Sequence, residues 1–254
     1  MISIIIPFRD KVELLETCLA SIFDKTKIDF EIILVDNGSQ ENKTKKYLDE
    51  IRGREFVKII DYKKPFSFSA INNLVVKYAS GEFVLFLNND TEVLTKKWLE
   101  KMAKQFEDPS VGAVGVKLLY PNGTIQHAGV KVGKNIATHQ FLRMKEGDLG
   151  ENNIIREVDA VTGACMMTRK DIFLEMGGFD EKNLAIAYND VDYCLRLRER
   201  GLKTIWTPEV KLFHYESASR KSDNSIFTKI FKRKRYEQFQ KEQEYMKKRW
   251  IEVV

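Results

Sequence analysis

Predominantly apolar runs recur along the N-terminal half of the chain, and each ends at a polar cluster. The first covers residues 2–6, and similar runs cover residues 31–35 and 82–87. Near-continuous apolar segments of this length are typical of strands buried on both faces, as in the centre of a parallel sheet. The pattern predicts three central strands, with a shorter strand over residues 56–60.

Between these runs, apolar residues recur every three or four positions, which predicts amphipathic helices. We expect helices over residues 12–23, 41–51 and 69–79, the last capped by Ser67 or Ser69. Alternating strands and helices predict an α/β fold with a mostly parallel, Rossmann-like central sheet flanked by helices. Ligands bind at the carboxyl ends of the strands in such sheets, so the polar clusters should converge on one edge.

The second half of the chain is less regular. Residues 119–155 contain a Pro-Asn-Gly turn and several glycines, which predict hairpins and loops of a substrate-side subdomain. The apolar stripe of residues 226–250 changes face, which predicts a helix with a break near Arg235. The other expected elements are helices over 96–106, 169–176 and 190–200 and strands over 111–117, 158–168 and 209–213.

Composition and charge limit the class of protein. With 254 residues, of which 43% are hydrophobic, the chain can bury a full core. Three cysteines without paired spacing indicate a reducing compartment. The N-terminal segment lacks the pattern of a signal peptide and no apolar run reaches the length of a membrane span, so we expect a cytoplasmic protein.

The positive charge is concentrated at the C-terminus. Residues 211–254 hold 12 Lys and Arg against 6 Asp and Glu, whereas the rest holds 30 against 31. We expect a domain over residues 1–225 and a basic amphipathic helical tail over 226–254. The tail could bind an anionic membrane at the inner face of the plasma membrane, and a solvated helix, a dimer contact or a linker are alternatives. The membrane interpretation places Phe227, Ile230 and Phe231 in the lipid and Lys229 and Lys232–Arg235 at the headgroups.

Two aspartates follow predicted strands directly. The carboxylate of Asp36 can accept hydrogen bonds from a pyrimidine imide or a ribose hydroxyl, or it can form an Asx-turn or a helix cap. Asp90 ends the segment Asn88-Asn89-Asp90 and offers a hard oxygen ligand for Mg²⁺ or Mn²⁺ on nucleotide phosphates. A simple turn is the alternative for this segment.

Two further residues are candidates for chemistry. Asp190 lies at the start of a predicted helix, where it could deprotonate a hydroxyl, although acids are common in first turns. His214 ends a predicted strand and would complete a divalent metal site if it lay beside Asp90, with a structural role as the alternative. Gly163 in Thr162-Gly163-Ala164 would let the backbone approach a ligand, or it marks a bulge.

Taken together, eight ordered segments resemble the family 2 glycosyltransferases of the GT-A fold. Two segments, PFSFSAINN and IQHAGV, are similar to bacterial members that build O-antigen, capsule and rhamnan-type polysaccharides. The resemblance covers residues 1 to about 220 and rests on IIIPFRD, LVDNGS, FSAINN, FLNNDTEV, VTGACMMTR, GGFDE, NDVDYCLRLRERG and HYESASR.

The resemblance implies an inverting hexosyl- or deoxyhexosyltransferase that needs Mn²⁺ or Mg²⁺. The donor would be a nucleoside-diphosphate sugar, UDP or dTDP by preference and GDP as a further option, and the acceptor a glycan or lipid-linked glycan of a growing bacterial surface polysaccharide. Nucleic acid is not an expected partner. The resemblance assigns Asp190 as the catalytic base and Asp90 and His214 as the metal ligands. The residues that it assigns to the nucleotide and donor are Pro7, Phe8, Arg9, Asp10, Asp36, Asn88, Asn89 and Asp90. Those that it assigns to the acceptor or sugar are Thr162, Gly163, Ala164 and Asn189.

The chain departs from the family pattern at two positions. Asn88 replaces the first carboxylate of the Asp-X-Asp motif, and Asn189 replaces the usual Glu before the base. Neither change removes the expected base or metal carboxylate. The alternative function is a non-catalytic nucleotide-sugar or glycan binding module. His127, His139 and Arg143 are additional candidate contacts, with structural roles as the alternative.

Overall fold

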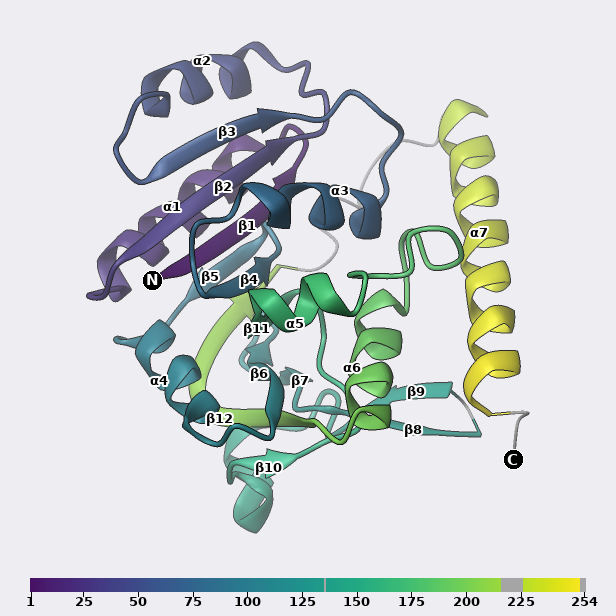
Figure 1. The fold of residues 1–254 in the computed structure, drawn as a ribbon. Helices are drawn as coiled ribbons and strands as arrows, with labels where there is room; N and C mark the ends of the chain where they lie inside the picture. The colour runs from purple at the N-terminus through teal and green to yellow at the C-terminus, as the bar shows by residue number, and fades with distance from the viewer. Residues whose placement is uncertain (135, 216–225, 252–254) are drawn as a thin grey trace.

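The computed structural model describes residues 1–134, 136–215 and 226–251. This part of the chain is built around a ten-stranded mixed sheet with helices on both faces (Figure 1). The main strand order is β10-β12-β6-β11-β4-β1-β2-β3, with β5 and β7 paired at the side. The predicted α/β class with a mostly parallel central sheet and flanking helices is confirmed.

The N-terminal half contains the predicted alternation of strands and helices. Strand β1 pairs in parallel with both β2 and β4, and β2 pairs in parallel with β3. Ser67, rather than Ser69, caps α3 through its hydroxyl, which accepts from the Ala70 N–H. The elements are β1 (Ile2–Phe8), α1 (Val12–Lys25), β2 (Phe30–Asp36), α2 (Asn42–Ile51), β3 (Val57–Asp61), α3 (Phe68–Val75), η1 (Val76–Tyr78) and β4 (Phe83–Leu87).

Two hydrophobic cores lie on opposite faces of the sheet. Successive side chains of a strand point to opposite faces, so Ile4 and Ile6 of β1 pack in one core and Ile5 in the other. Helices α1, α2 and α4 (Trp98–Lys104) cover the first face, and α3, α5 (Lys170–Glu175) and α6 (Asn189–Glu199) cover the second (Figure 1). Both faces are covered, which explains why the central strands are apolar throughout.

The C-terminal half follows the prediction less closely. Strand β11 begins only at Cys165, because the preceding residues form a loop against α6. Strand β12 is twelve residues long instead of five, and a register shift between Thr207 and Lys211 accommodates Pro208. The remaining elements are β5 (Thr91–Val93), η2 (Gln105–Glu107), β6 (Val111–Leu119), β7 (Ile125–His127), β8 (Val130–Gly133), β9 (Ile136–His139), η3 (Glu146–Asn152), β10 (Arg156–Glu157), β11 (Cys165–Arg169) and β12 (Lys203–His214).

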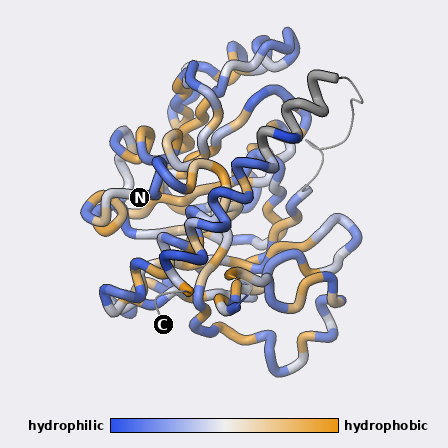
Figure 2. The backbone as a smooth tube through the Cα atoms, turned by 90° about the vertical axis from the view of Figure 1, so that its right-hand side faces the viewer, coloured by the Kyte–Doolittle hydropathy of each residue, from blue (hydrophilic) through white to orange (hydrophobic). Residues whose placement is uncertain are grey.

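The C-terminal segment is one continuous helix, α7 (Ile226–Trp250), so the expected break near Arg235 is wrong. In its C-terminal half, Glu242 and Met246 are fully buried. Figure 2 shows α7 as a mostly hydrophilic tube running across the face of the protein. In the described part of the chain, no helix has the length and hydropathy of a membrane span. Residues 216–225 and the side chains of Phe227, Lys229, Ile230, Phe231, Lys232, Lys234 and Arg235 lie outside the described residues.

One glycine of the sheet tests how tightly the second core is packed. A Cβ on Gly115 of β6 would lie 2.4 Å from the Cβ of Val161, closer than two carbon atoms can approach. We expect Gly115→Ala to lower the free energy of unfolding by about 1–3 kcal/mol, measured by urea denaturation. Gly133→Ala is the matched control, because no atom lies within 4 Å of its added Cβ. Equal stability of the two variants would contradict the packing described here.

Candidate active site

The loops after β1 and β2 are tied together at the carboxyl edge of the sheet. The Asp10 N–H donates to the Ser39 hydroxyl at 2.8 Å, and Asp10 Oδ1 accepts from the N–H groups of Gln40 and Glu41. Asp10 therefore caps the turn that enters α2. Phe8 packs in the core at 3% exposure, whereas Arg9 is exposed. Pro7 is also buried in β1, so a ligand at this edge would meet the backbone of the loop and Arg9.

Asp36 combines the two interpretations that its position allowed. Its Oδ1 accepts from the Ser39 N–H at 2.8 Å, which is an Asx-turn. Its Oδ2 has no hydrogen-bond partner among the residues that the structure describes. The adjacent Asn37 side chain donates to the carbonyl groups of Tyr62 and Lys64 and holds the loop in place. One oxygen of Asp36 therefore orders the turn while the other can accept from a ligand.

Asp90 and His214 lie side by side, as the sequence hypothesis required. Their Oδ1 and Nε2 atoms are 3.2 Å apart. The pairing of β12 with β5 places His214 opposite Thr91, and the Tyr215 N–H donates to the Asp90 carbonyl. This strand pairing and one adjoining backbone hydrogen bond fix a contact between residues more than 120 positions apart.

Gln126 fixes the protonation pattern of His214. The Gln126 Oε1 lies 2.6 Å from Nδ1 of His214, and a carbonyl oxygen can only accept, so Nδ1 donates. In the neutral imidazole, Nε2 then presents its lone pair toward Asp90 and the Asn88 amide, 3.2 Å away. Metal-binding histidines are oriented in this way by a second hydrogen bond. This role of Gln126 was not predicted, because its one local signal in the sequence is a polar residue between Ile125 and His127 of the short buried strand β7.

The donor set at this position fits a divalent cation. The Asp90 carboxylate and the Nε2 lone pair are both acceptors, and their close approach is favourable when a cation lies beside them. Among the described residues, no group of three or more His, Cys, Asp or Glu side chains converges for a metal. A two-ligand site suits Mg²⁺ or Mn²⁺, which take further ligands from substrate phosphates and water. Asn89 lies half-buried between Asn88 and Asp90 at the same strand end.

Asp190 is held at the start of α6 by backbone hydrogen bonds. Its Oδ2 accepts from the Gly163 N–H and its Oδ1 from the Val191 N–H, each at 2.8 Å. Burial raises the pKa of Asp190, and these two hydrogen bonds partly oppose the rise. A Cβ on Gly163 would lie 3.2 Å from the Phe68 ring, so the absence of a side chain lets the Gly163 backbone lie close to both Phe68 and Asp190. Neighbouring Asn189 is buried, and its Nδ2 has no partner within the described chain, which leaves that donor available to a ligand.

The segment Thr162-Gly163-Ala164 connects Asp190 to the strand end that carries Asn88 and Asp90. Gly163 donates to Asp190, and the carbonyl of Ala164 accepts from the Asn88 N–H at 3.0 Å. The Thr162 hydroxyl accepts from the Ala164 N–H and orders the turn. The structure therefore brings the expected base, the expected metal ligands and this segment to one edge of the sheet.

The chain has three histidines, and all of them gather at this edge. The Nδ1 atoms of His127 and His139 are 3.0 Å apart, so one ring donates to the other. Burial lowers the pKa of His127 well below the usual value, and the neighbouring His139, Arg156 and His214 lower it further. His139 in turn favours the ionised form of Asp190. Arg143, the third additional candidate, is exposed, and its backbone N–H donates to the Ile125 carbonyl.

Residues 3–177 match the family model described as Glycosyl transferase family 2, which covers more than half of the chain. The chain belongs to glycosyl transferase family 2. It is 42% identical over 228 residues to the O-antigen biosynthesis protein RfbC of Myxococcus xanthus, an alignment that covers 87% of this chain and 18% of RfbC. This family 2 chain therefore spans less than a fifth of the relative's length.

Solved structures show the same GT-A fold. GalNAc-T7 in complex with UDP, GalNAc and Mn²⁺ superposes with a TM-score of 0.71 at 16% identity, over 85% of this chain and 44% of that one. The mannosyltransferase PcManGT of Pyrobaculum calidifontis, in complex with GDP-Man and Mn²⁺, has a TM-score of 0.63 at 17% identity, over 84% and 56% of the two chains. The family and the fold expected from the sequence segments are both confirmed.

Proposed function

We propose that this protein is a metal-dependent, inverting glycosyltransferase that transfers a sugar from a nucleoside-diphosphate sugar to a hydroxyl of a growing bacterial surface glycan. The observation that carries the proposal is the placement of Asp190 and the Asp90–His214 pair on either side of Thr162-Gly163-Ala164. A base on one side and a diphosphate-binding pair on the other are the two requirements of a single displacement at an anomeric carbon.

Each residue of the site has a role in this reaction. Asp190, ionised and fixed by Gly163, accepts the proton of the acceptor hydroxyl as that oxygen attacks the sugar. Asp90 and His214 would hold the divalent cation, which when bound neutralises charge on the leaving diphosphate. The free oxygen of Asp36 would accept a hydrogen bond from the nucleoside. A single displacement of this kind inverts the anomeric configuration.

The nucleotide would bind over the carboxyl ends of β1, β2 and β4, and its identity is assigned by analogy with the family. We assign UDP or dTDP as the preferred nucleotide, and the same edge can accommodate GDP. The two solved relatives hold UDP in one case and GDP-Man in the other, so the fold alone accepts either base. The transferred group is a hexose or deoxyhexose.

A donor screen tests the proposed reaction. Purified protein is incubated with UDP-, dTDP- and GDP-hexoses and deoxyhexoses, with Mn²⁺ and a lipid-linked glycan acceptor, and release of nucleoside diphosphate is followed. We expect release from one donor class, with the product anomer by NMR opposite to that of the donor. Retained configuration would contradict direct displacement. Donor binding without turnover in any combination would favour a non-catalytic binding module.

The activity should depend on pH through Asp190. Its pKa is raised by burial, and the base acts only when ionised, so kcat/KM should fall as the pH decreases through that raised pKa. The acid limb should lie above the usual Asp range, which is centred at about 3.9. The measurement is kcat/KM against pH, with circular dichroism at each pH to confirm that the protein remains folded. Constant activity in folded protein down to about pH 4 would exclude Asp190 as a base with a raised pKa.

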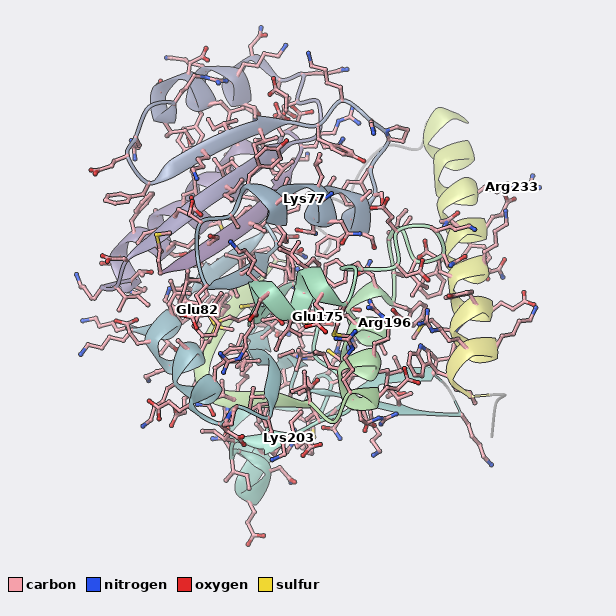
Figure 3. All side chains as sticks on the ribbon, viewed as in Figure 1. Lys77, Glu82, Glu175, Arg196, Lys203 and Arg233 are labelled. Atoms are coloured by element: carbon pink, nitrogen blue, oxygen red, sulfur yellow. The ribbon has the colours of Figure 1, made fainter. Side chains whose placement is uncertain are left out.

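A lipid-linked acceptor would lie at the inner face of the plasma membrane, and we assign the basic α7 as the contact to anionic headgroups. Arg233 supports this assignment, because its side chain is 82% exposed and points away from the body of the protein (Figure 3). Replacing Lys232, Arg233, Lys234 and Arg235 with Gln should reduce co-sedimentation with phosphatidylglycerol liposomes. Undiminished binding would end the membrane assignment.

A further inference from the structure

The C-terminal helix α7 packs against the segment that carries Asp190. This segment, residues 180–192, leads from the end of α5 into the first turn of α6. Figure 1 shows α7 standing beside α6 and the loop that precedes it. Helix α7 contacts this segment both before and after Asp190 along the chain.

Glu242 makes the central contact. It is fully buried, and its two carboxylate oxygens accept from the N–H groups of Ile186 at 3.2 Å and Ala187 at 2.7 Å. The Gln238 side chain, one turn earlier on α7, donates to the same carboxylate at 2.7 Å. A buried carboxylate with three N–H donors is well satisfied, and losing it would leave two backbone N–H groups without their acceptor.

Contacts at both ends of the segment flank this one. At the upstream end, the Tyr245 hydroxyl donates to Asp180 at 2.9 Å. At the downstream end, the Trp250 indole donates to Asp192 at 3.0 Å, and Arg249 lies 3.3 Å from the same carboxylate oxygen. Asp192 lies two residues after Asp190, so α7 holds the first turn of α6 directly.

The residue between these contacts has an unfavourable backbone conformation. Tyr188, at the N-cap of α6, has φ 60° and ψ 0°, in the left-handed region that non-glycine residues rarely occupy. Such a residue persists where its surroundings determine it. Its ring lies 5.5 Å from that of Phe239, and its hydroxyl hydrogen-bonds the Gln243 side chain, so α7 supplies part of those surroundings.

We infer that α7 is the positioning element for the catalytic base, and that Glu242 is its central positioning residue. The inference rests on the proposed glycosyl transfer with Asp190 as base. Glu242 acts through the backbone of Ile186 and Ala187, and it sets the direction from which Asp190 meets the acceptor hydroxyl. The helix therefore belongs functionally to the transferase domain, and the expected boundary at residue 225 separates two parts of one catalytic unit.

The test compares Glu242→Gln with Glu244→Gln in the full chain. Gln keeps the volume of Glu242 but presents an amide N–H to one of the two backbone donors. Glu244 is the control, because it is exposed and forms an ion pair with Lys248 on the surface of the same helix. A misplacement of about 1 Å costs on the order of 10²-fold in rate, so we expect kcat to fall by that order in Glu242→Gln. The KM for the donor should be unchanged, because the hydrogen bonds of Glu242 in the described chain go to Ile186, Ala187 and Gln238 and not to β1, β2 or β4. Glu244→Gln should match wild type.

Hydrogen exchange measured by mass spectrometry gives a readout independent of activity. Exchange in Glu242→Gln should accelerate in residues 180–192 and stay at the wild-type rate in β2. If Glu242→Gln does not fold, Trp250→Phe replaces it as the test. This variant keeps an aromatic ring, though a smaller one, and removes the N–H donor to Asp192, so exchange should accelerate in the same segment.

The possible outcomes separate this inference from the proposed function. Local acceleration together with a selective loss of kcat supports it. Unchanged exchange, exchange that rises throughout the protein, or local acceleration at wild-type kcat overturns it. If wild-type protein transfers no sugar, the proposed function fails, and unchanged exchange in residues 180–192 would still refute the conformational role of α7.

Discussion

Replacing Asp190 with Asn is expected to lower kcat by about 10²–10⁴-fold, the usual contribution of a general base. Asn has nearly the same shape, and its carbonyl oxygen can still accept from the Gly163 N–H, while its amide nitrogen replaces the oxygen that accepts from the Val191 N–H. Circular dichroism of the variant therefore accompanies the assay and should match that of the wild type. What is lost is a group able to take the proton of the acceptor hydroxyl. The measurement is single-turnover transfer at saturating donor, with nucleotide binding measured in parallel and expected to be unchanged.

Asp171→Asn is the control for this substitution. Asp171 also lies in the first turn of a helix, α5, and is exposed, with its carboxylate accepting only from the Ile172 N–H among the described residues. It should leave kcat at the wild-type value. Wild-type turnover in Asp190→Asn would show that another group acts as the base.

Removing Asp90 is expected to abolish metal-dependent nucleotide binding together with turnover. Residues that merely orient a metal ligand contribute about 10–100-fold to affinity or activity, and loss of a carboxylate ligand should exceed this range. In Asp90→Ala, His214 keeps its hydrogen bond to Gln126, and the site loses the negative charge of the Asp90 carboxylate. The measurement is isothermal titration of the nucleotide with Mn²⁺ and again with excess EDTA.

Two further variants distinguish the metal site from the surrounding structure. Gln126→Ala removes the group that fixes Nδ1 of His214, so it should produce the smaller, about 10–100-fold effect of an orienting residue. Asp49→Ala removes an exposed carboxylate on α2 and should change nothing. If nucleotide binds Asp90→Ala and wild type equally in the presence of Mn²⁺, the assignment of Asp90 as a metal ligand is wrong.

The parallel half of the fold could be predicted because its strands are apolar on both faces and its helices have a regular period. The expected positions of β1, β2 and β4 then placed Asp36 and Asp90 at one edge without any contact information. Strand β12 extends beyond the predicted residues 209–213 on the far side of Pro208. Proline cannot donate a ladder hydrogen bond, and the register shift beside it, which is not visible in the sequence, lets the strand continue. Three-residue β5 was missed because no periodic signal exists at that length.

The functional contacts that escaped prediction join residues far apart in the chain. Gln126 and His214 are 88 positions apart, and Glu242 and Ile186 are 56 apart. Neither pair carries a local pattern, since a polar residue in a strand and an acid on a basic helix both suit an exposed position. The shifting stripe of α7 was interpreted as a break for the same reason, because the partner of Glu242 and Met246 was unknown from the sequence alone.

Thermal stabilisation by nucleotides is the most direct test of a metal-dependent donor site at Asp36, Asp90 and His214. Purified protein is heated with UDP, dTDP, GDP or CMP, each with and without Mn²⁺. Ligand at 100 times its Kd adds about 2.7 kcal/mol of stability, which raises the Tm of a chain this size by about 5–10 °C. We predict such a rise for one nucleoside diphosphate, only with Mn²⁺, and its absence in Asp90→Ala. If no nucleotide raises the Tm of wild-type protein, with or without metal, the assigned donor site is contradicted.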